Sequence, residues 1–345
     1  MANATIVTSI KPLGFIASSI ADGVTDTEVL VPAGASPHDY SLKPSDIQKL
    51  QGAELILWVG EDIDAFLDKT LRPMPFKKVL SIADFAEIGG LLEGEAHDHK
   101  HEHDHTHKHD HDHKHDHDHK HDHNHDPITH DHNHDHNHKH DHAHKHDHEH
   151  KHDHDHKHDH EHKHDHAHGH EHDHSTNWHV WYSPEISKIV ATRLATRLTE
   201  AYPEKKEKIA QNLAEFNRTL AEQSEKIKQQ LAPVKEKGFY VFHDAYSYFN
   251  NAYGLKQTGY FTINPLVAPG AKTLAKIKQE IKEHKVNCLF AEPQFTPKVI
   301  ESLSKGTGVH VGRLDPMGDA VKLGVNSYAN FLQYTADSYF ACLSK

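Results

Sequence analysis

The chain has 345 residues, 43 of them histidine and two cysteine, and a formal charge of −13 with histidine counted as neutral. A tract from His97 to His174 holds 38 of the histidines and nearly all of the net charge, so the other 267 residues are close to neutral. This body has no basic stripe for nucleic acid and too few cysteines for a zinc ribbon or an iron–sulfur cluster. It also has no run of about 18 apolar residues that would span a membrane.

The first hundred residues alternate short apolar runs with helical patterns. Predicted strands cover 5–9, 28–31, 54–59 and 78–80, and predicted helices cover 44–51 and 63–70. This rhythm is typical of a parallel sheet with helices on both faces. The start of the chain lacks the basic and apolar regions of a signal peptide. We therefore expect either a cytosolic protein or a mature chain whose signal was replaced by Met1.

The tract between His97 and His174 places histidine at nearly every second position, among Asp, Lys, Asn and Glu. Because no apolar face can form, we expect a disordered insertion and not a domain. Four H-E-x-x-H matches there follow from any Glu between two histidines, so a metalloprotease site is not expected. Weak, multivalent metal binding at up to about ten sites is our interpretation. A dispensable repeat expansion and a pH-responsive spacer are the alternatives.

After the tract, Ser183 and Pro184 form a typical helix start, with Ser as the N-cap. That helix is predicted to end near Tyr202, and a second one of about 28 residues, roughly 42 Å long, follows through Leu231. We expect this long helix to be a rigid strut. The pattern then continues with predicted strands at 239–242, 287–291 and 309–314 and predicted helices at 245–252, 274–284, 297–305 and 327–343.

These elements predict an α/β protein of two lobes, each with a mainly parallel sheet, joined by one long helix. The predicted N-terminal lobe comprises 1–96 and 175–202, and the tract is 97–174. The linking helix is 203–233, and the C-terminal lobe is 234–345.

Ligands of open α/β sheets bind beyond the carboxyl ends of the strands. His38 lies in the loop after one predicted strand, and His243 directly follows another. His179 lies in a short run, predicted to be extended, before the helix cap, and Asp315 follows the strand at 309–314. Two donors from each half predict a metal site in a cleft between lobes. Three neutral imidazoles and one oxygen suit Zn²⁺, whereas manganese prefers more oxygen donors.

The two remaining histidines of the body are expected to lie outside this site. His284 falls in a charged helical run, and His310 falls in the middle of a predicted strand. Cys288 and Cys342 are either two buried thiols or a disulfide closing a loop of roughly 55 residues. Such a disulfide would stabilise the fold by about 4 kcal/mol in the chain-entropy model and would imply an oxidising compartment.

Five motifs resemble those of the zinc-specific substrate-binding proteins of bacterial ABC importers, the ZnuA type. They are Ser36-Pro37-His38-Asp39-Tyr40-Ser41-Leu42, His179-Val180-Trp181, Phe242-His243-Asp244-Ala245-Tyr246, Phe290-Ala291-Glu292-Pro293-Gln294-Phe295 and Leu314-Asp315-Pro316. The resemblance covers nearly the whole body in the same order. It implies a periplasmic monomer, without enzymatic activity, that delivers zinc to a membrane permease driven by a cytoplasmic ATPase.

Carried over residue by residue, the resemblance implies His38, His179 and His243 as zinc ligands. Some relatives place Glu just before the first ligand, where this chain has Pro37, which cannot bind. The fourth donor is therefore expected to be water or Asp315. The resemblance also implies a bond between the two cysteines, and it gives the acidic, histidine-rich loop a role in low-affinity zinc capture or buffering.

The sequence leaves three other functional hypotheses open. A manganese or iron binder of the same family is disfavoured because those relatives have Glu at the position of His243. A zinc hydrolase would need a general base beside the metal, for which Glu292 is the candidate; otherwise Glu292 is a candidate for supporting a ligand. A metal store or a lipid-anchored adhesin is the third class, and the chain shows no lipid-attachment cysteine near its start.

Overall fold

The computed structural model describes residues 5–94, 175–262, 269–284, 286–293, 297–305 and 307–345. The tract at 97–174, with the predictions made for it, lies outside the described residues. The described part of the chain forms one compact unit.

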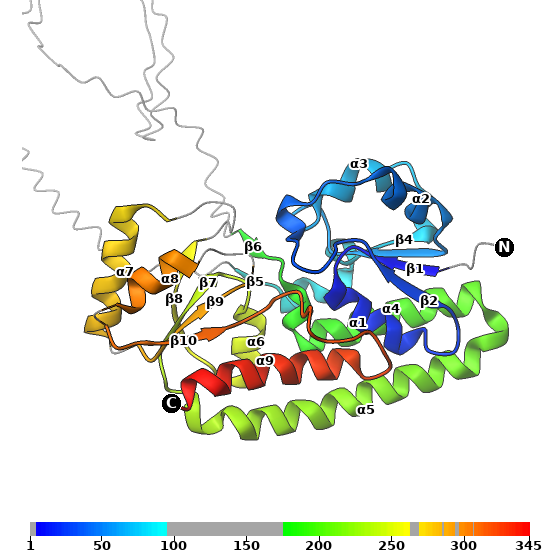
Figure 1. Ribbon diagram of the computed structural model, residues 1–345. Helices are drawn as coiled ribbons and strands as arrows, with labels where there is room; N and C mark the ends of the chain where they lie inside the picture. Colours follow the sequence, from blue (N-terminus) through cyan, green and yellow to red (C-terminus); the bar gives the residue numbers. More distant parts are fainter. Residues whose placement is uncertain (1–4, 95–174, 263–268, 285, 294–296, 306) are drawn as a thin grey trace, which may run out of the picture. The chain divides into compact units, whose positions relative to one another are not determined.

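Two four-stranded sheets, each entirely parallel, organise this unit (Figure 1). The first sheet has the order β2-β1-β3-β4 and the second β10-β9-β7-β8. The first contains β1 (Thr5–Thr8), β2 (Asp26–Val29), β3 (Leu55–Trp58) and β4 (Val79–Ser81). The second contains β7 (Phe239–His243), β8 (Gln257–Thr262), β9 (Cys288–Ala291) and β10 (His310–Arg313). The predicted α/β class with two parallel sheets is confirmed.

The helices cover these sheets and connect them. They are α1 (Lys11–Ile20), α2 (Pro44–Gly52), α3 (Asp68–Leu71), α4 (Pro184–Ala201), α5 (Lys206–Leu231), α6 (Ser247–Tyr253), α7 (Ala271–Glu283), α8 (Pro297–Ser304) and α9 (Ser327–Leu343). Short 3₁₀ turns add to them, of which η1 (Pro37–Asp39), η6 (Val180–Tyr182) and η7 (Pro203–Lys205) matter here. A two-stranded antiparallel pair, β5 (Glu93–Gly94) with β6 (Thr176–Asn177), lies where the tract leaves and rejoins the body.

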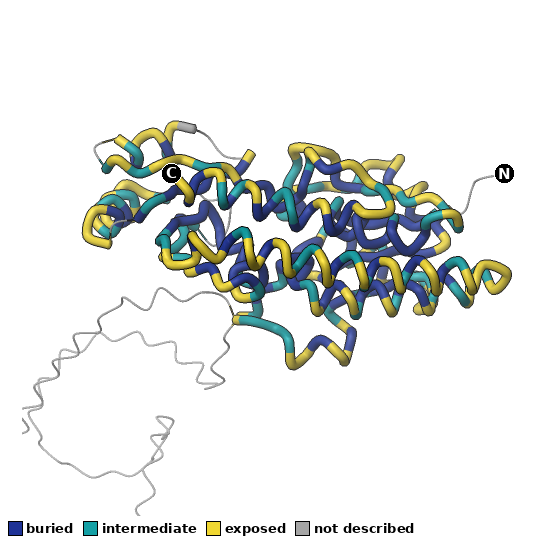
Figure 2. The backbone as a smooth tube through the Cα atoms, turned by 90° about the horizontal axis from the view of Figure 1, so that it is seen from below, coloured by how far each residue is buried: buried dark blue, intermediate teal, exposed yellow. Residues whose placement is uncertain are grey.

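The long helix predicted between the two halves of the chain is present as α5. Its 26 residues span about 39 Å, and it packs against α1, α4, α6 and α9. Its buried face includes Ile209, Phe216 and Ile227 at helical spacing, and Figure 2 shows buried and exposed positions alternating along it. Both sheets contribute to one continuous apolar core, in which Tyr182 stacks on Phe331 with ring centroids 5.2 Å apart.

Several predicted boundaries and local conformations differ from the structure; among them, α7 begins at Ala271, three residues earlier than predicted. Strand β2 lies two residues earlier than predicted, and the first turn of the helix predicted at 63–70 is a 3₁₀ turn. His179 precedes the 3₁₀ turn η6, so its run is not an extended one. Strand β8 was not predicted because Gly259 interrupts its pattern. That glycine is required by packing, since a Cβ at this position would lie 2.5 Å from the Tyr240 ring.

Among the described residues, no helix combines the length and the apolar composition needed to cross a bilayer.

Candidate metal centre

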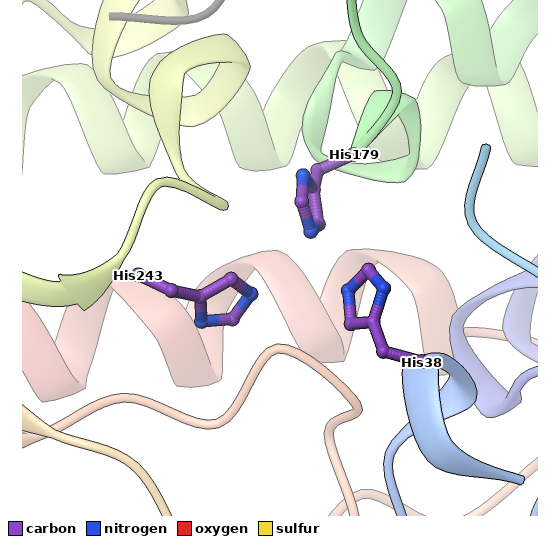
Figure 3. A group of neighbouring side chains, drawn as sticks. All are labelled: His38, His179 and His243. Atoms are coloured by element: carbon purple, nitrogen blue, oxygen red, sulfur yellow. The ribbon is translucent and has the colours of Figure 1, made fainter. Parts of the chain in front are cut away.

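Three imidazoles from three separate segments converge on one point (Figure 3). His38 lies in η1, His179 immediately precedes η6, and His243 is the last residue of β7. Each ring offers one nitrogen, and these three atoms lie within 4.8 Å of one another. The ring centroids are 5.2 to 6.1 Å apart. Among the described residues, these three histidines are the one group of His, Cys, Asp or Glu side chains whose ligand atoms lie close enough together to hold a metal ion.

Local sequence fixes the backbone that presents His38. The Ser36 hydroxyl accepts a hydrogen bond from the His38 amide at 3.2 Å, and Pro37 pre-sets the first turn of η1. The loop therefore enters the site through a capped 3₁₀ turn, which limits the directions in which the imidazole can point.

Asn177 sets the orientation and tautomer of His179. Its Oδ1 accepts hydrogen bonds from the His179 amide at 3.1 Å and from Nδ1 of the ring at 2.8 Å. The Asn177 amide in turn donates to the Asp244 carbonyl at 2.8 Å, so its oxygen faces the histidine. With the proton on Nδ1, the lone pair of His179 is on Nε2. That atom is buried and has no hydrogen-bond partner among the described residues, so its lone pair is available to a metal ion.

Glu292 performs the same task for His243. Its two carboxylate oxygens lie 2.6 and 2.8 Å from Nδ1 of His243, and the Tyr246 hydroxyl donates to one of them at 2.8 Å. The ring nitrogen farther from the backbone points toward the other two histidines (Figure 3). A carboxylate on the far nitrogen of a ligating histidine fixes the ring and raises its basicity. Glu292 therefore lies where a ligand-supporting residue is needed.

The electrostatic environment keeps two of these rings neutral. Burial, followed by the proximity of His243, lowers the pKa of His38 to about 4. Burial, followed by His243 and His38, also holds the pKa of His179 well below its ordinary value. A metal binds only the neutral form of imidazole. These two ligands therefore meet little competition from protons at neutral or mildly acidic pH.

Asp315, which the sequence offered beside water as the fourth donor, does not belong to the three-histidine group. It is 8% exposed, and both of its carboxylate oxygens accept backbone hydrogen bonds, from Met317 at 3.0 Å and from Asp319 at 2.9 Å. His284 directly follows α7 as its C-cap, and His310 is the first residue of β10, not a mid-strand residue as predicted; both are exposed and lie outside the group.

Two residues that contribute to the site were missed in the sequence. Asn177 lies two positions before His179, and Tyr246 lies three after His243. Their proximity in sequence is a weak signal, because only the fold shows that Asn177 contacts the His179 ring and that Tyr246 contacts Glu292, the partner of the His243 ring. The bond between Cys288 and Cys342 is present and joins β9 to α9.

Comparison with known proteins places the chain in a family. The model of the family described as zinc-uptake complex component A, periplasmic (ZnuA), matches residues 6–342. The high-affinity zinc uptake system protein ZnuA of Haemophilus influenzae is 66% identical over 345 residues, covering 100% of this chain and 94% of the relative. The corresponding ZnuA protein of Yersinia pestis is 40% identical, covering 99% of this chain and 92% of its own length.

Solved structures agree with the fold. A crystal structure of ZnuA superimposes with a TM-score of 0.66 at 20% identity, covering 99% of both chains. The chain belongs to the ZnuA family, and the resemblance that the sequence motifs indicated is confirmed.

Proposed function

We propose that this chain binds one Zn²⁺ ion in the periplasm through His38, His179 and His243 and delivers it to the membrane permease of a zinc importer. The observation that carries the proposal is the convergence of three imidazole nitrogens, of which Nε2 of His179 is buried without a partner among the described residues. Membership of a family of periplasmic zinc-uptake components supports the ion, the compartment and the role in transport.

The chemistry of the donors favours zinc over manganese or iron. Zinc takes imidazole nitrogens at about 2.0–2.1 Å, which places tetrahedral donors roughly 3.3 Å apart. The three nitrogens lie within 4.8 Å of one another, so a small inward movement of the rings completes the geometry. Manganese favours carboxylate and water oxygens, and the nearby carboxylate of Glu292 is engaged with His243 and Tyr246.

The fourth donor remains a choice between water and Asp315. The backbone hydrogen bonds to both oxygens of Asp315 favour water, because Asp315 would have to give up at least one of them to reach an ion.

We infer that the chain is not an enzyme. A metal hydrolase needs an open coordination position with a general base beside it. Glu292, the candidate base, is only 4% exposed and is held by the His243 ring and the Tyr246 hydroxyl. A zinc-loaded protein that hydrolyses no ester, peptide or phosphate model substrate would agree with this inference.

The partner and the tract complete the proposal. The permease, with its cytoplasmic ATPase, receives the ion from a monomeric carrier. The tract, with 38 histidines and a charge of −12 from its lysines and carboxylates, captures and buffers zinc at lower affinity. We expect weaker binding in the tract than at the centre in the body, where three imidazole nitrogens already lie within 4.8 Å of one another.

Zinc titration of the full chain against a competing chelator tests the proposal. The chelator must be strong enough to remove ions from the tract first. His179→Ala should abolish the tightest site, whereas His284→Ala, the matched loss of an exposed histidine, should leave it unchanged. A His179→Ala protein that retains the tight ion would refute the site.

A further inference from the structure

Residues 314–326, here called the crossover segment, connect β10 of the second sheet to α9. At one end, the Leu314 amide donates to the Ala291 carbonyl of β9 at 2.9 Å. At the other end, the Val325 carbonyl accepts a hydrogen bond from Ser19 of α1. The segment is therefore tied to the second sheet and to the helix that follows β1, and its middle lies beside the loop that carries His38.

Asp319 makes the contact with that loop. Its carboxylate accepts a hydrogen bond from the Gly34 amide at 2.8 Å, and its carbonyl accepts one from the Lys11 ammonium at 2.9 Å. The carboxylate is a charged acceptor, and such hydrogen bonds are stronger than those between neutral groups. Asp319 thus joins the crossover segment directly to the loop between β2 and His38.

Asp315 holds Asp319 in turn. One oxygen of the Asp315 carboxylate accepts from the Asp319 amide at 2.9 Å, and the other accepts from the Met317 amide at 3.0 Å. The turn that these bonds close contains Gly318, whose φ of +60° and close contact with the Phe331 ring suit only glycine. The Asp315 carboxylate therefore shapes the turn, and the Asp319 carboxylate on that turn contacts the loop that carries His38.

The chain between Gly34 and His38 has little freedom to absorb a displacement. Gly34, with a φ of +80°, is the third residue of a turn closed by the Ala35 amide and the Pro32 carbonyl at 3.1 Å. The capped 3₁₀ turn at 37–39 follows immediately. A shift of Gly34 is therefore passed on to His38, four residues later.

We propose that Asp319 is a positioning residue for the metal centre: it holds the His38 loop in place through Gly34 and so slows zinc dissociation. The inference rests on the proposed function, in which His38 ligates zinc. Asp315 then acts through Asp319 and does not need to touch the ion.

A double-mutant cycle in the full chain tests this role, with zinc affinity and the zinc dissociation rate measured by chelator competition. Asp319→Ala should weaken the tight site about fivefold, within the range of an ordinary net hydrogen bond because this one is exposed to water, and should speed dissociation to match. His38→Ala should leave a much weaker site formed by His179 and His243, and in that background the same change should alter the residual affinity less than about twofold, because the residue it positions is gone. Asp319→Asn, which keeps an accepting oxygen, should remain within about twofold of the unchanged protein.

Asp337→Ala is the control for loss of a carboxylate. Asp337 is exposed on α9 and accepts hydrogen bonds from Gln230 of α5 and from Gln333 of its own helix, so its loss also removes an interhelical contact, yet zinc affinity should not change. An equal effect of Asp319→Ala in both backgrounds, or none in either, overturns the positioning role and leaves the proposed site standing. A His38→Ala protein that binds zinc like the unchanged chain overturns the site itself and the positioning role with it.

Discussion

Lowering the pH should strip zinc from the tract well before it strips zinc from the centre in the body. Both kinds of site bind zinc through imidazole nitrogens, but the imidazoles differ in pKa and therefore in how far they are protonated at a given pH. A solvated histidine has a pKa of about 6.5, whereas burial and the proximity of His243 lower the pKa of His38 to about 4. Burial acts in the same direction on the pKa of His179.

The magnitude follows from the proton that each ligand must lose. At pH 5, an imidazole of pKa 6.5 costs about 2 kcal/mol to deprotonate, so a tract site with three imidazoles loses about 6 kcal/mol of binding free energy. At the same pH, an imidazole of pKa about 4, such as His38, costs less than about 0.1 kcal/mol. Since a lowered pKa delays protonation, competition at His38 begins only as the pH approaches 4.

The assay is the number of zinc ions retained per chain between pH 7.5 and 4, for the full chain and for a chain lacking residues 97–174. The full chain should lose several ions between pH 7.5 and 5 and keep one. The deletion variant should hold one ion throughout that range. Identical curves, or loss of the last ion at pH 6, would refute the reasoning.

Three further outcomes are expected. Deleting residues 97–174 should leave one tight zinc per chain at pH 7.5, within about threefold of the original affinity by chelator competition, because the three ligands of the body remain; loss of tight binding would place the site in the tract. Glu292→Gln should weaken zinc binding by about 10- to 100-fold, because the His243 ring loses its charged partner, and an unchanged affinity would contradict that role. Reduction of Cys288–Cys342, which are 54 positions apart, should lower the free energy of unfolding by up to about 4 kcal/mol in urea titrations while leaving one tight zinc bound, since no ligand is lost; equal stability of the two forms would argue against a stabilising role.

Elements with strong patterns could be predicted from sequence. Helix α9 was predicted at 327–343, where the structure has it, and Ser183 caps α4 by accepting a hydrogen bond from the Ile186 amide, as its position before Pro184 indicated. Strands β3, β7 and β9 are nearly or fully buried, and their apolar runs identified them within one residue at each end. Strand β2 is half exposed, so its boundaries carried little signal.

Part of the metal site could also be predicted from the sequence. His38 and His243 could be assigned to one site because each lies at or beyond the carboxyl end of a parallel strand, one in each sheet, where ligands of α/β sheets bind. Other contacts could not be predicted from the sequence, because they depend on loop conformations that no periodicity encodes. These are the hydrogen bonds of Asn177 and those that the carboxylates of Asp315 and Asp319 accept from backbone amides. Gly259 shows the same limit in the fold, because its need for a missing Cβ is set by Tyr240 on a neighbouring strand.

Anomalous scattering at the zinc absorption edge from a crystal of the zinc-loaded chain tests the central claim most directly. The account predicts one strong peak in the body, about 2.0–2.1 Å from a ring nitrogen of each of His38, His179 and His243, with water as the expected fourth donor. A strong peak elsewhere in the body, with these three rings bound to no metal, would contradict it.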